Sequence, residues 1–288
     1  MTQETVVPDE LERTRQAWDR IAVGYDRYVT PTGDWALPQQ ALAHAGVVRG
    51  TTFLDVASGS GALSLPAARL GAEVTAVDLS PVMIERLHAR AREEGLTNVA
   101  GHVMDGHTLT LEDDRFDAAG SQFGVMLFPD LPRALREMVR VTRPGGRVLM
   151  VAYDHPSTVE FLTYFVGAIQ AAVPGFTGLP MEPLPLPFQV ADPHRLHDEL
   201  AAAGLAEVSI EPGTERLSFT SADHMWDWVT NSNPIGAGMV ADLTEEQRAG
   251  VRQVLDGMLR ERSGGSPGAE LTAQVHIAVG TKPDPSTS

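Results

Sequence analysis

Three aspartates in the first half of the sequence each close a predicted β-strand. Asp55 closes the apolar run TTFLDVA, Asp78 closes AEVTAVD, and Asp105 closes NVAGHVMD. In an open parallel sheet, ligands bind outside the carboxyl ends of the strands, near the point where the strand order reverses. The three carboxylates are therefore expected along one rim. A single acid at a strand end can simply cap the helix that follows. The interpretation as a ligand-binding rim therefore depends on finding acids at the ends of three successive strands.

The turn after the first of these strands carries two nearly adjacent glycines. The segment DVASGSG places Gly59 and Gly61 between a strand and a helix-prone stretch. Glycine permits a positive φ and leaves the main chain bare, so backbone donors at the positive end of the next helix can reach a ligand. An anionic or ribose-bearing ligand is indicated, and Asp78 is placed to accept hydrogen bonds from ribose hydroxyls. The alternative is a tight connection that binds nothing.

The same turn argues against a dinucleotide. The dinucleotide fingerprint Gly-x-Gly-x-x-Gly needs a third glycine where this chain has Ser64. A carboxylate at Asp55 would also repel a pyrophosphate, whereas it would favour a cation. A ligand with an adenosine, an α-amino group and a sulfonium suits the rim better, and an NAD-dependent oxidoreductase is kept as the alternative enzyme class.

The elements that must position these residues alternate along the chain. From residue 51 to Tyr153, apolar strands are separated by helical patterns, and a helix at 191–205 and strands at 206–212 and 272–280 follow. Such alternation is typical of a mainly parallel sheet that is covered by helices on both faces. An α/β fold is therefore predicted.

Further segments flank or interrupt this core. The proline-rich stretch GLPMEPLPLPFQV should be an irregular cover, because its prolines lack donors and fix φ. The predicted organisation is a disordered N-terminus at 1–10, an N-terminal helical cover at 11–50, a core at 51–280 with lid insertions at 155–190 and 213–270, and a disordered tail at 281–288.

Several of these segments together resemble one family. FLDVASGSG, AVDLS, VMDGHTL, FDAAGSQF, LREMVRVTRPGGRVLM and the leading WDRIAVGYD are similar to class I S-adenosylmethionine-dependent methyltransferases, in particular to ubiquinone and menaquinone C-methyltransferases and small-molecule methyltransferases of secondary metabolism. The resemblance covers residues 15–153, and the first loop departs from it where Ala57 replaces a glycine. It implies a Rossmann-like, doubly wound sheet of seven strands, the last antiparallel, with helical lid insertions.

The resemblance also implies a cofactor, S-adenosyl-L-methionine, and the residues that hold it. Asp78 is expected on the ribose hydroxyls, and Gln122 near the transferable methyl group. Tyr25 is expected to close over the cofactor, and Asp55 to face its cationic end. The remaining expected contacts are Ala57, Ser58, Gly59 and Gly61 on the methionine and ribose, Leu79 and Met83 on the adenine, and Asp105, Gly106 and His107 at its amino edge.

The implied reaction is methyl transfer to an O, N or C atom of a small, partly hydrophobic metabolite. A base is expected if the acceptor must lose a proton, and His155 and His224 are the candidates, each with a plain surface role as the alternative. Trp226, Trp228, Phe123, Phe128 and Phe188 are candidates for an apolar substrate pocket. His194 and His197 have metal-compatible spacing but no third ligand, so no metal is predicted.

The amino-acid composition limits the kinds of partner and chemistry that this chain can have. The formal net charge of −16 repels phosphate backbones and anionic membranes, so neither nucleic acid nor a membrane is an expected partner. The absence of cysteine excludes disulfides and thiolate chemistry. With no signal-peptide pattern and no apolar run of about 20 residues, a cytoplasmic protein is expected. A homodimer and a non-catalytic S-adenosylmethionine-binding protein are left open.

Overall fold

The computed structural model describes residues 10–30, 33, 35–232 and 234–287. The predicted disordered segment 1–10 lies outside the described residues except for Glu10, which begins the first helix. The strands are β1 Thr52–Val56, β2 Glu73–Asp78, β3 Val99–Val103, β4 Phe116–Gln122, β5 Thr142–Tyr153, β6 Ala206–Phe219 and β7 Ala269–Thr281. The α-helices are α1 Glu10–Gly24, α2 Ala36–His44, α3 Ser64–Arg69, α4 Pro81–Glu93, α5 Leu131–Val141, α6 Glu160–Ala172, α7 Pro193–Ala202, α8 Ala222–Ser232, α9 Pro234–Met239 and α10 Glu245–Ser263. Short helical turns of other types are η1 Tyr25–Val29, a π-helix, and the 3₁₀ turns η2 Val125–Leu127, η3 Pro156–Thr158, η4 Leu186–Phe188 and η5 Pro285–Thr287.

The seven strands form one sheet in the order β3-β2-β1-β4-β5-β7-β6. Neighbouring strands from β3 to β5 are parallel, and β7 runs antiparallel to both β5 and β6. The predicted Rossmann-like sheet of seven strands with an antiparallel last strand is confirmed. The strand order reverses between β1 and β4, so their carboxyl ends flank the crevice where ligands bind in such sheets.

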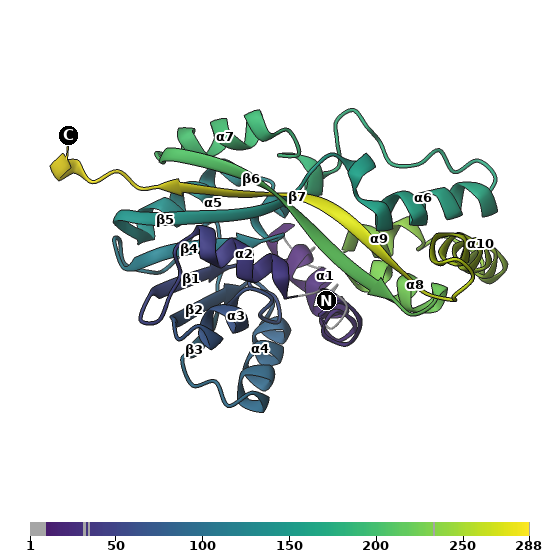
Figure 1. Ribbon diagram of the computed structural model, residues 1–288, viewed down its shortest axis with the longest axis horizontal. Helices are drawn as coiled ribbons and strands as arrows, with labels where there is room; N and C mark the ends of the chain where they lie inside the picture. Colours follow the sequence, from purple (N-terminus) through teal and green to yellow (C-terminus); the bar gives the residue numbers. More distant parts are fainter. Residues whose placement is uncertain (1–9, 31–32, 34, 233, 288) are drawn as a thin grey trace, which may run out of the picture.

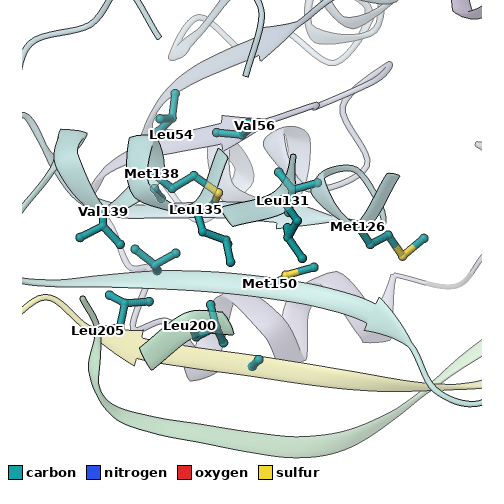
Figure 2. Packing of buried hydrophobic residues seen from close by; sticks show 14 of the residues in the cluster. Leu54, Val56, Met126, Leu131, Leu135, Met138, Val139, Met150, Leu200 and Leu205 are labelled. Atoms are coloured by element: carbon teal, nitrogen blue, oxygen red, sulfur yellow. The ribbon is translucent and has the colours of Figure 1, made fainter. Parts of the chain in front are cut away.

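Helices cover both faces of the sheet because its central strands are buried on both sides. On β2, Val74 and Ala76 face the cluster that contains α2, α3 and α4, while Val77 faces the cluster that contains α5 and α7. Figure 2 shows the second cluster, in which Leu135 and Met138 of α5 and Leu200 of α7 lie against Met150 of β5. Alternation with period two along each strand produces this two-sided core.

The last two strands extend beyond the rest of the sheet. β7 pairs with β5 only as far as Val275, but with β6 as far as Ala269. The distal halves form a two-stranded ribbon, and α6, α8 and α10 pack on it around a separate apolar cluster that contains Phe165, Trp226 and Leu255. Figure 1 shows this group at the opposite end of the molecule from β3. We call α6, α8, α9, α10 and the distal ribbon the lid.

The lid differs from the predicted insertions at two places. The second insertion was expected from residue 213, but β6 continues to Phe219, so its helices begin only at Ala222. Pro212 interrupts the pattern without ending the strand, because β6 is the edge strand of the sheet and a missing donor is tolerated there. The first insertion also contains a regular helix, α6, whose buried Phe161, Phe165 and Ile169 follow helical spacing.

The N-terminal helices connect the core to the lid. α1 contacts α4 of the core and α8 of the lid, and η1 contacts α8 as well. Ser80 donates to Asp19 of α1 at 2.5 Å, and Thr30 is hydrogen-bonded to Ser60 in the glycine turn at 3.0 Å. Gly33 forms an isolated bridge with Leu217 of β6. The segment therefore lies over the edge of the sheet at which the three aspartates were expected.

The other end of the chain stays attached to the core beyond residue 281, where a disordered tail was predicted. The Lys282 amide donates to the Gly146 carbonyl at 2.9 Å, and Lys282 Nζ donates to Asp114 Oδ1 at 2.7 Å and to the Thr142 carbonyl at 2.8 Å. These bonds fix the residue to the amino end of β5, so the expected start of the tail is too early.

Candidate cofactor and active site

A cavity of about 470 Å³ lies at the carboxyl edge of the sheet, between the core, α1 and the lid. Twelve of the thirteen predicted cofactor residues line it, namely Tyr25, Asp55, Ala57, Ser58, Gly59, Asp78, Leu79, Met83, Asp105, Gly106, His107 and Gln122. They come from the ends of four strands and from η1. The three aspartates therefore share one rim, which is what the strand pattern predicted.

The glycine turn is held in a left-handed conformation. Gly59 has φ +53° and Gly61 has φ +100°. Ala57, which lies between the end of β1 and the glycines, has φ +55°. Gly61 does not line the cavity. A Cβ at this position would lie 2.4 Å from Leu87 Cδ1 of α4, so Gly61 serves the close packing of the turn on the helices. Gly59 lies beneath the Tyr25 ring, whose Cε1 would be 3.9 Å from an added Cβ.

Asp55 is buried, with 1% of its surface exposed, at the end of β1. Ser64 Oγ donates to its Oδ2 at 2.5 Å. The pKa of Asp55 is raised to about 7, mainly because the carboxyl is buried; the bond from Ser64 lowers this pKa, and the nearby charge of Asp78 contributes to the rise. The serine that breaks the dinucleotide fingerprint is thus the donor that holds this carboxylate. A cation placed in the cavity would favour its charged form.

Asp78 ends β2 and holds the turn in place. Its Oδ2 accepts from the Gly59 amide at 2.9 Å and its Oδ1 accepts from the Ser80 amide at 2.8 Å. Burial raises the pKa of Asp78 to about 6 in spite of these bonds. Each carboxylate oxygen has capacity for a second donor, so the side chain can accept from two adjacent hydroxyls. This is the geometry that a ribose requires.

The third aspartate lies in the cavity wall beside two aromatic rings. Asp105 Oδ1 accepts from the His107 amide at 3.0 Å and lies 2.9 Å from His107 Nδ1. The His107 and Phe128 rings are 4.5 Å apart, and Gly106 is so close to Phe128 that an added Cβ would be 2.6 Å from its Cε2. Leu79, Met83 and Met104 also line this part of the cavity. This part of the cavity wall is therefore apolar and contains rings, with the Asp105 carboxylate beside it.

The remaining part of the cavity is aromatic and contains unsatisfied polar atoms. Tyr153 Oη donates to Glu215 Oε2 at 3.2 Å, and Phe123 stacks on Tyr153 with ring centroids 4.4 Å apart. Gln122 Oε1 and Trp228 Nε1 are buried and have no hydrogen-bond partner among the described residues. Because buried polar atoms are normally bonded, a ligand or a water in the cavity is expected to supply the missing partners. Burial raises the pKa of Tyr25 to about 12 and that of Tyr153 well above its usual range, so both hydroxyls keep their protons.

Comparison with known proteins assigns this architecture to a family. A family model described as a methyltransferase domain matches residues 54–150. The demethylmenaquinone methyltransferase of Renibacterium salmoninarum is 35% identical over 170 residues, which are 58% of this chain and 68% of that protein. The chain belongs to the class I S-adenosylmethionine-dependent methyltransferases. S-adenosylmethionine is the cofactor of these methyltransferases, and the residues present fit it, because the three aspartates that line the cavity offer carboxylates to a cation and to hydroxyl and amino donors.

Two further comparisons define the extent of the likeness. An uncharacterised protein of Mycobacterium tuberculosis is 38% identical over 144 residues, 47% of this chain and 52% of that protein. The chain thus spans about half the length of such curated relatives. The phosphoethanolamine N-methyltransferase 2 of Haemonchus contortus, solved in complex with S-adenosyl-L-methionine, superimposes with a TM-score of 0.58 at 18% identity and covers 97% of this chain and 61% of that one. At that identity the likeness shows the methyltransferase fold.

The two histidines predicted as bases lie outside the cavity of this methyltransferase. His155 is exposed, and its ring caps η3 through Ser157, with Nδ1 2.8 Å from Ser157 Oγ. His224 packs against Phe219 and accepts from the Thr220 amide through Nδ1 at 3.2 Å. Neither ring is among the residues that line the cavity. The structure therefore does not support a catalytic role for either, because a base must reach the acceptor proton directly or through one water.

Three of the five aromatic residues predicted for a substrate pocket lie at the cavity. Phe123, Phe128 and Trp228 line the cavity, whereas Trp226 and Phe188 do not. Trp226 packs against Phe165 inside the lid, because helical spacing turns it away from Trp228 on the same helix. Among the lining residues that the sequence analysis missed are Leu11, Thr14 and Trp18 on α1, and Tyr153, Phe161 and Glu215 on β5, α6 and β6.

Different signals could have found the missed residues. Tyr153 ends β5 as Gln122 ends β4, so the rule of strand ends applies to it as well. Glu215 carried no such signal, because the strand was predicted to stop at residue 212. Among the described residues no group of three or more histidine or acidic side chains is placed to hold a metal ion.

Proposed function

We propose that this protein transfers a methyl group from S-adenosylmethionine to an oxygen, nitrogen or carbon atom of a small, partly hydrophobic metabolite. The observation that carries the proposal is the composition of the cavity. One half is the rim of three aspartates, and the other half is aromatic and contains two buried polar atoms without partners among the described residues. A cofactor and an acceptor can therefore lie side by side in one cavity.

The chain's own residues would hold the cofactor along the rim. Asp78 would accept from the ribose, Met83 and Leu79 would contact the base, and Asp55 would face the cationic end. When bound, S-adenosylmethionine supplies an electrophilic methyl group whose bond to sulfur breaks as the acceptor's electron pair forms the new bond, leaving S-adenosylhomocysteine.

The protein's contribution is orientation and exclusion of water. Holding two reactants in the correct geometry gives effective molarities of about 10⁵–10⁸ M. α1 and η1 cover the glycine turn, and α8 of the lid brings Trp228 to the opposite wall. These elements lie where closure would seal the cavity after both ligands have entered, as lids do in many enzymes.

The acceptor is proposed to be a small molecule of secondary metabolism, and the protein to be cytoplasmic. The net charge of −16 disfavours nucleic acid, and the cavity walls leave room for a compact ligand. No helix within the described part of the chain is long and apolar enough to cross a membrane. A homodimer remains a proposal that size-exclusion chromatography with light scattering would decide.

Two other functions make different predictions. An NAD-dependent oxidoreductase is disfavoured by the hydrogen bond from Ser64 to Asp55, which places a carboxylate where a pyrophosphate would lie. A non-catalytic S-adenosylmethionine-binding protein would have the same rim but would never release a methylated product.

The experiment is methyl transfer from S-adenosylmethionine labelled in its methyl group to a fractionated small-molecule extract. We expect label in one or a few low-molecular-weight products, at a rate that follows enzyme concentration. Label bound to the protein without any labelled product, when the cofactor is bound in solution, would favour the non-catalytic alternative.

A further inference from the structure

The lid side of the cavity contains a buried hydrogen-bond donor that lacks a described partner. Trp228 of α8 lines the cavity and is only 3% exposed, and its Nε1 has no partner among the described residues. Its ring contacts two other rings, Phe161 with centroids 4.6 Å apart and Phe219 with centroids 5.7 Å apart. The indole is therefore held in place by packing that leaves its N–H group unused.

The Trp228 N–H group defines the kind of atom that it can bind. An indole nitrogen only donates, so the missing partner is an acceptor atom. Gln122 Oε1, which also lacks a partner among the described residues, could accept, but the two atoms are not bonded to each other. A water at Trp228 would need several polar partners, whereas the rings that contact the indole are phenylalanines. A ligand oxygen would satisfy the donor and remove the cost of leaving it unpaired.

Four ring contacts in sequence, which we call the aromatic wall, lead from this donor to the cofactor rim: Trp228, Phe161, Tyr153 and Phe123. Tyr153 meets Phe161 edge to face with centroids 5.8 Å apart, and Phe123 stacks on Tyr153 at 4.4 Å. Burial chiefly raises the pKa of Tyr153, and Tyr25 is among the nearby groups that raise it further. Tyr153 therefore lies near the side chain that covers the glycine turn. A flat, apolar ring on this wall would make offset or edge-to-face contacts beside the cofactor.

The charged residues of the cavity restrict the charge of such a ligand. Arg133 is the only lysine or arginine among the described residues that line it. Its Nη2 donates to Thr108 Oγ1 at 2.6 Å, and the Thr108 amide donates to the Asp105 carbonyl, so this cation belongs to the Asp105 side. A carboxylate or phosphate on the aromatic wall would therefore face the acidic rim without a cation of its own. A protonated amine has no electron pair for Trp228. An uncharged oxygen meets both restrictions.

We propose that Trp228 determines acceptor specificity, with its indole N–H group bound to an uncharged oxygen of an aromatic acceptor whose ring lies on the aromatic wall. This inference rests on the proposed function. The hydrogen bond anchors one end of the acceptor and so fixes which of its atoms faces the transferable methyl group. The anchoring oxygen belongs to a carbonyl, ether or hydroxyl group, since each offers an electron pair. Trp228 takes no part in proton transfer, because its N–H group keeps its proton throughout.

The first test measures binding and does not require turnover. The protein is saturated with S-adenosylhomocysteine and titrated by calorimetry with acetophenone, which carries a carbonyl oxygen, with ethylbenzene, which lacks it, and with benzoate, which is charged. We expect acetophenone to bind at least about tenfold more tightly than either analogue, because without an acceptor atom the buried N–H group stays unpaired. Trp228→Phe should remove the preference over ethylbenzene and leave the affinity for S-adenosylhomocysteine unchanged. Trp226→Phe, on the same helix but outside the cavity, should behave as wild type.

The second test detects the hydrogen bond itself. The chain has four tryptophans, so a proton–nitrogen correlation spectrum of the same complex contains four indole N–H signals, and Trp228→Phe identifies the one that belongs to Trp228. Acetophenone should move this signal to a higher proton chemical shift than ethylbenzene does, because hydrogen bonding to oxygen deshields the proton. A role of Trp228 in packing alone would give the same shift with two probes of nearly the same shape.

The outcomes are distinguishable. If wild type fails to bind S-adenosylhomocysteine, the proposed function fails and this inference fails with it. If S-adenosylhomocysteine binds but acetophenone does not, or binds no better than ethylbenzene, the N–H group has another partner and the inference is overturned. It is also overturned if Trp228→Phe weakens S-adenosylhomocysteine and keeps the preference for acetophenone, because Trp228 then contacts the cofactor. Tighter binding of benzoate than of acetophenone would contradict the uncharged oxygen.

Discussion

Asp55 is the residue whose charge depends most directly on what fills the cavity. It lies fully inside the protein, and Ser64 is its hydrogen-bond donor. Burial raises its pKa from an ordinary value of 3.8 to about 7. Without a cation beside it, the carboxylate therefore retains its proton in the folded protein at pH values where an exposed aspartate has lost it.

This shift predicts a pH dependence of stability. Between about pH 4 and pH 7 the folded protein holds a proton that the unfolded chain has released, so the free energy of unfolding falls as the pH rises through this window. Asp55→Asn cannot ionise and should show a smaller fall. The measurement is urea unfolding of the ligand-free protein at about pH 5 and pH 8.

Asp78, whose pKa is raised to about 6, should account for much of the dependence that remains in Asp55→Asn. An equal fall in wild type and in Asp55→Asn would show that Asp55 is ionised in the folded protein at both pH values, which contradicts the account of its burial.

Ala57 is a second residue whose effect on stability can be tested, because its backbone conformation is strained. It occupies the family's first-glycine position with φ +55°, where an L-residue is strained by roughly 1–2 kcal/mol. Ala57→Gly relieves the strain, but glycine loses more backbone entropy on folding, which lowers the free energy of unfolding by roughly 0.5–1 kcal/mol. We expect the variant to be neutral to about 1 kcal/mol more stable in urea unfolding and to keep its affinity for S-adenosylmethionine.

The matched control is Ala67→Gly in α3, where the backbone is helical and the alanine is buried. It should lose about 1 kcal/mol or more, because glycine is a poor helix former and a buried methyl group is removed. If Ala57→Gly were destabilised as much as Ala67→Gly, the turn would not be strained.

At the scale of elements, α1 is the part that joins the cofactor rim to the lid. Gly24 ends α1 so close to α8 that a Cβ would lie 1.8 Å from Asn231 Oδ1. Gly24→Ala therefore forces the Asn231 side chain out of its position or moves the two helices apart. We expect it to weaken the affinity for S-adenosylmethionine about tenfold by calorimetry, because the cover over Tyr25 and the glycine turn would loosen.

Gly257→Ala is the matched control, since a Cβ at this α10 position meets nothing within 4 Å. It should bind as wild type does and gain up to about 1 kcal/mol from helix propensity. Wild-type affinity in Gly24→Ala would show that the contact between α1 and α8 does not govern the cofactor site.

The elements of the core could be predicted from the sequence because their patterns are strong. Strands buried on both faces are continuous apolar runs, and Gly59 and Gly61 mark the turn between β1 and α3. Strand-end acids then predict a shared rim without any tertiary information. The methyltransferase resemblance added the roles of the rim residues.

The lid could not be predicted in the same way. Pro212 suggested a strand end, although an edge strand tolerates a proline, and the distal ribbon with Glu215 was therefore assigned to an insertion. Whether a histidine such as His155 faces the cavity or the solvent depends on a connection without periodicity. The lid side of the cavity is built from such segments, so its residues emerged only from the structure.

In the whole molecule, the core and the lid lie at opposite ends, and β6 and β7 run from one to the other (Figure 1). The cavity lies between them, and its walls carry Asp55, Asp78, Asp105 and Glu215. In a chain of net charge −16, this arrangement favours a ligand with positive charge over one with two phosphates. The central claim is therefore that the rim binds S-adenosylmethionine.

Calorimetric titration with S-adenosylmethionine and with NAD tests this claim most directly, in wild type, Asp78→Asn and Asp117→Asn. Asp117 lies at the opposite end of the sheet, where it accepts from the Thr52 amide, and serves as the control. We predict micromolar binding of S-adenosylmethionine by wild type and Asp117→Asn, about 10–100-fold weaker binding by Asp78→Asn, and no binding of NAD. Binding of NAD in place of S-adenosylmethionine, or an unchanged affinity in Asp78→Asn, would contradict the account.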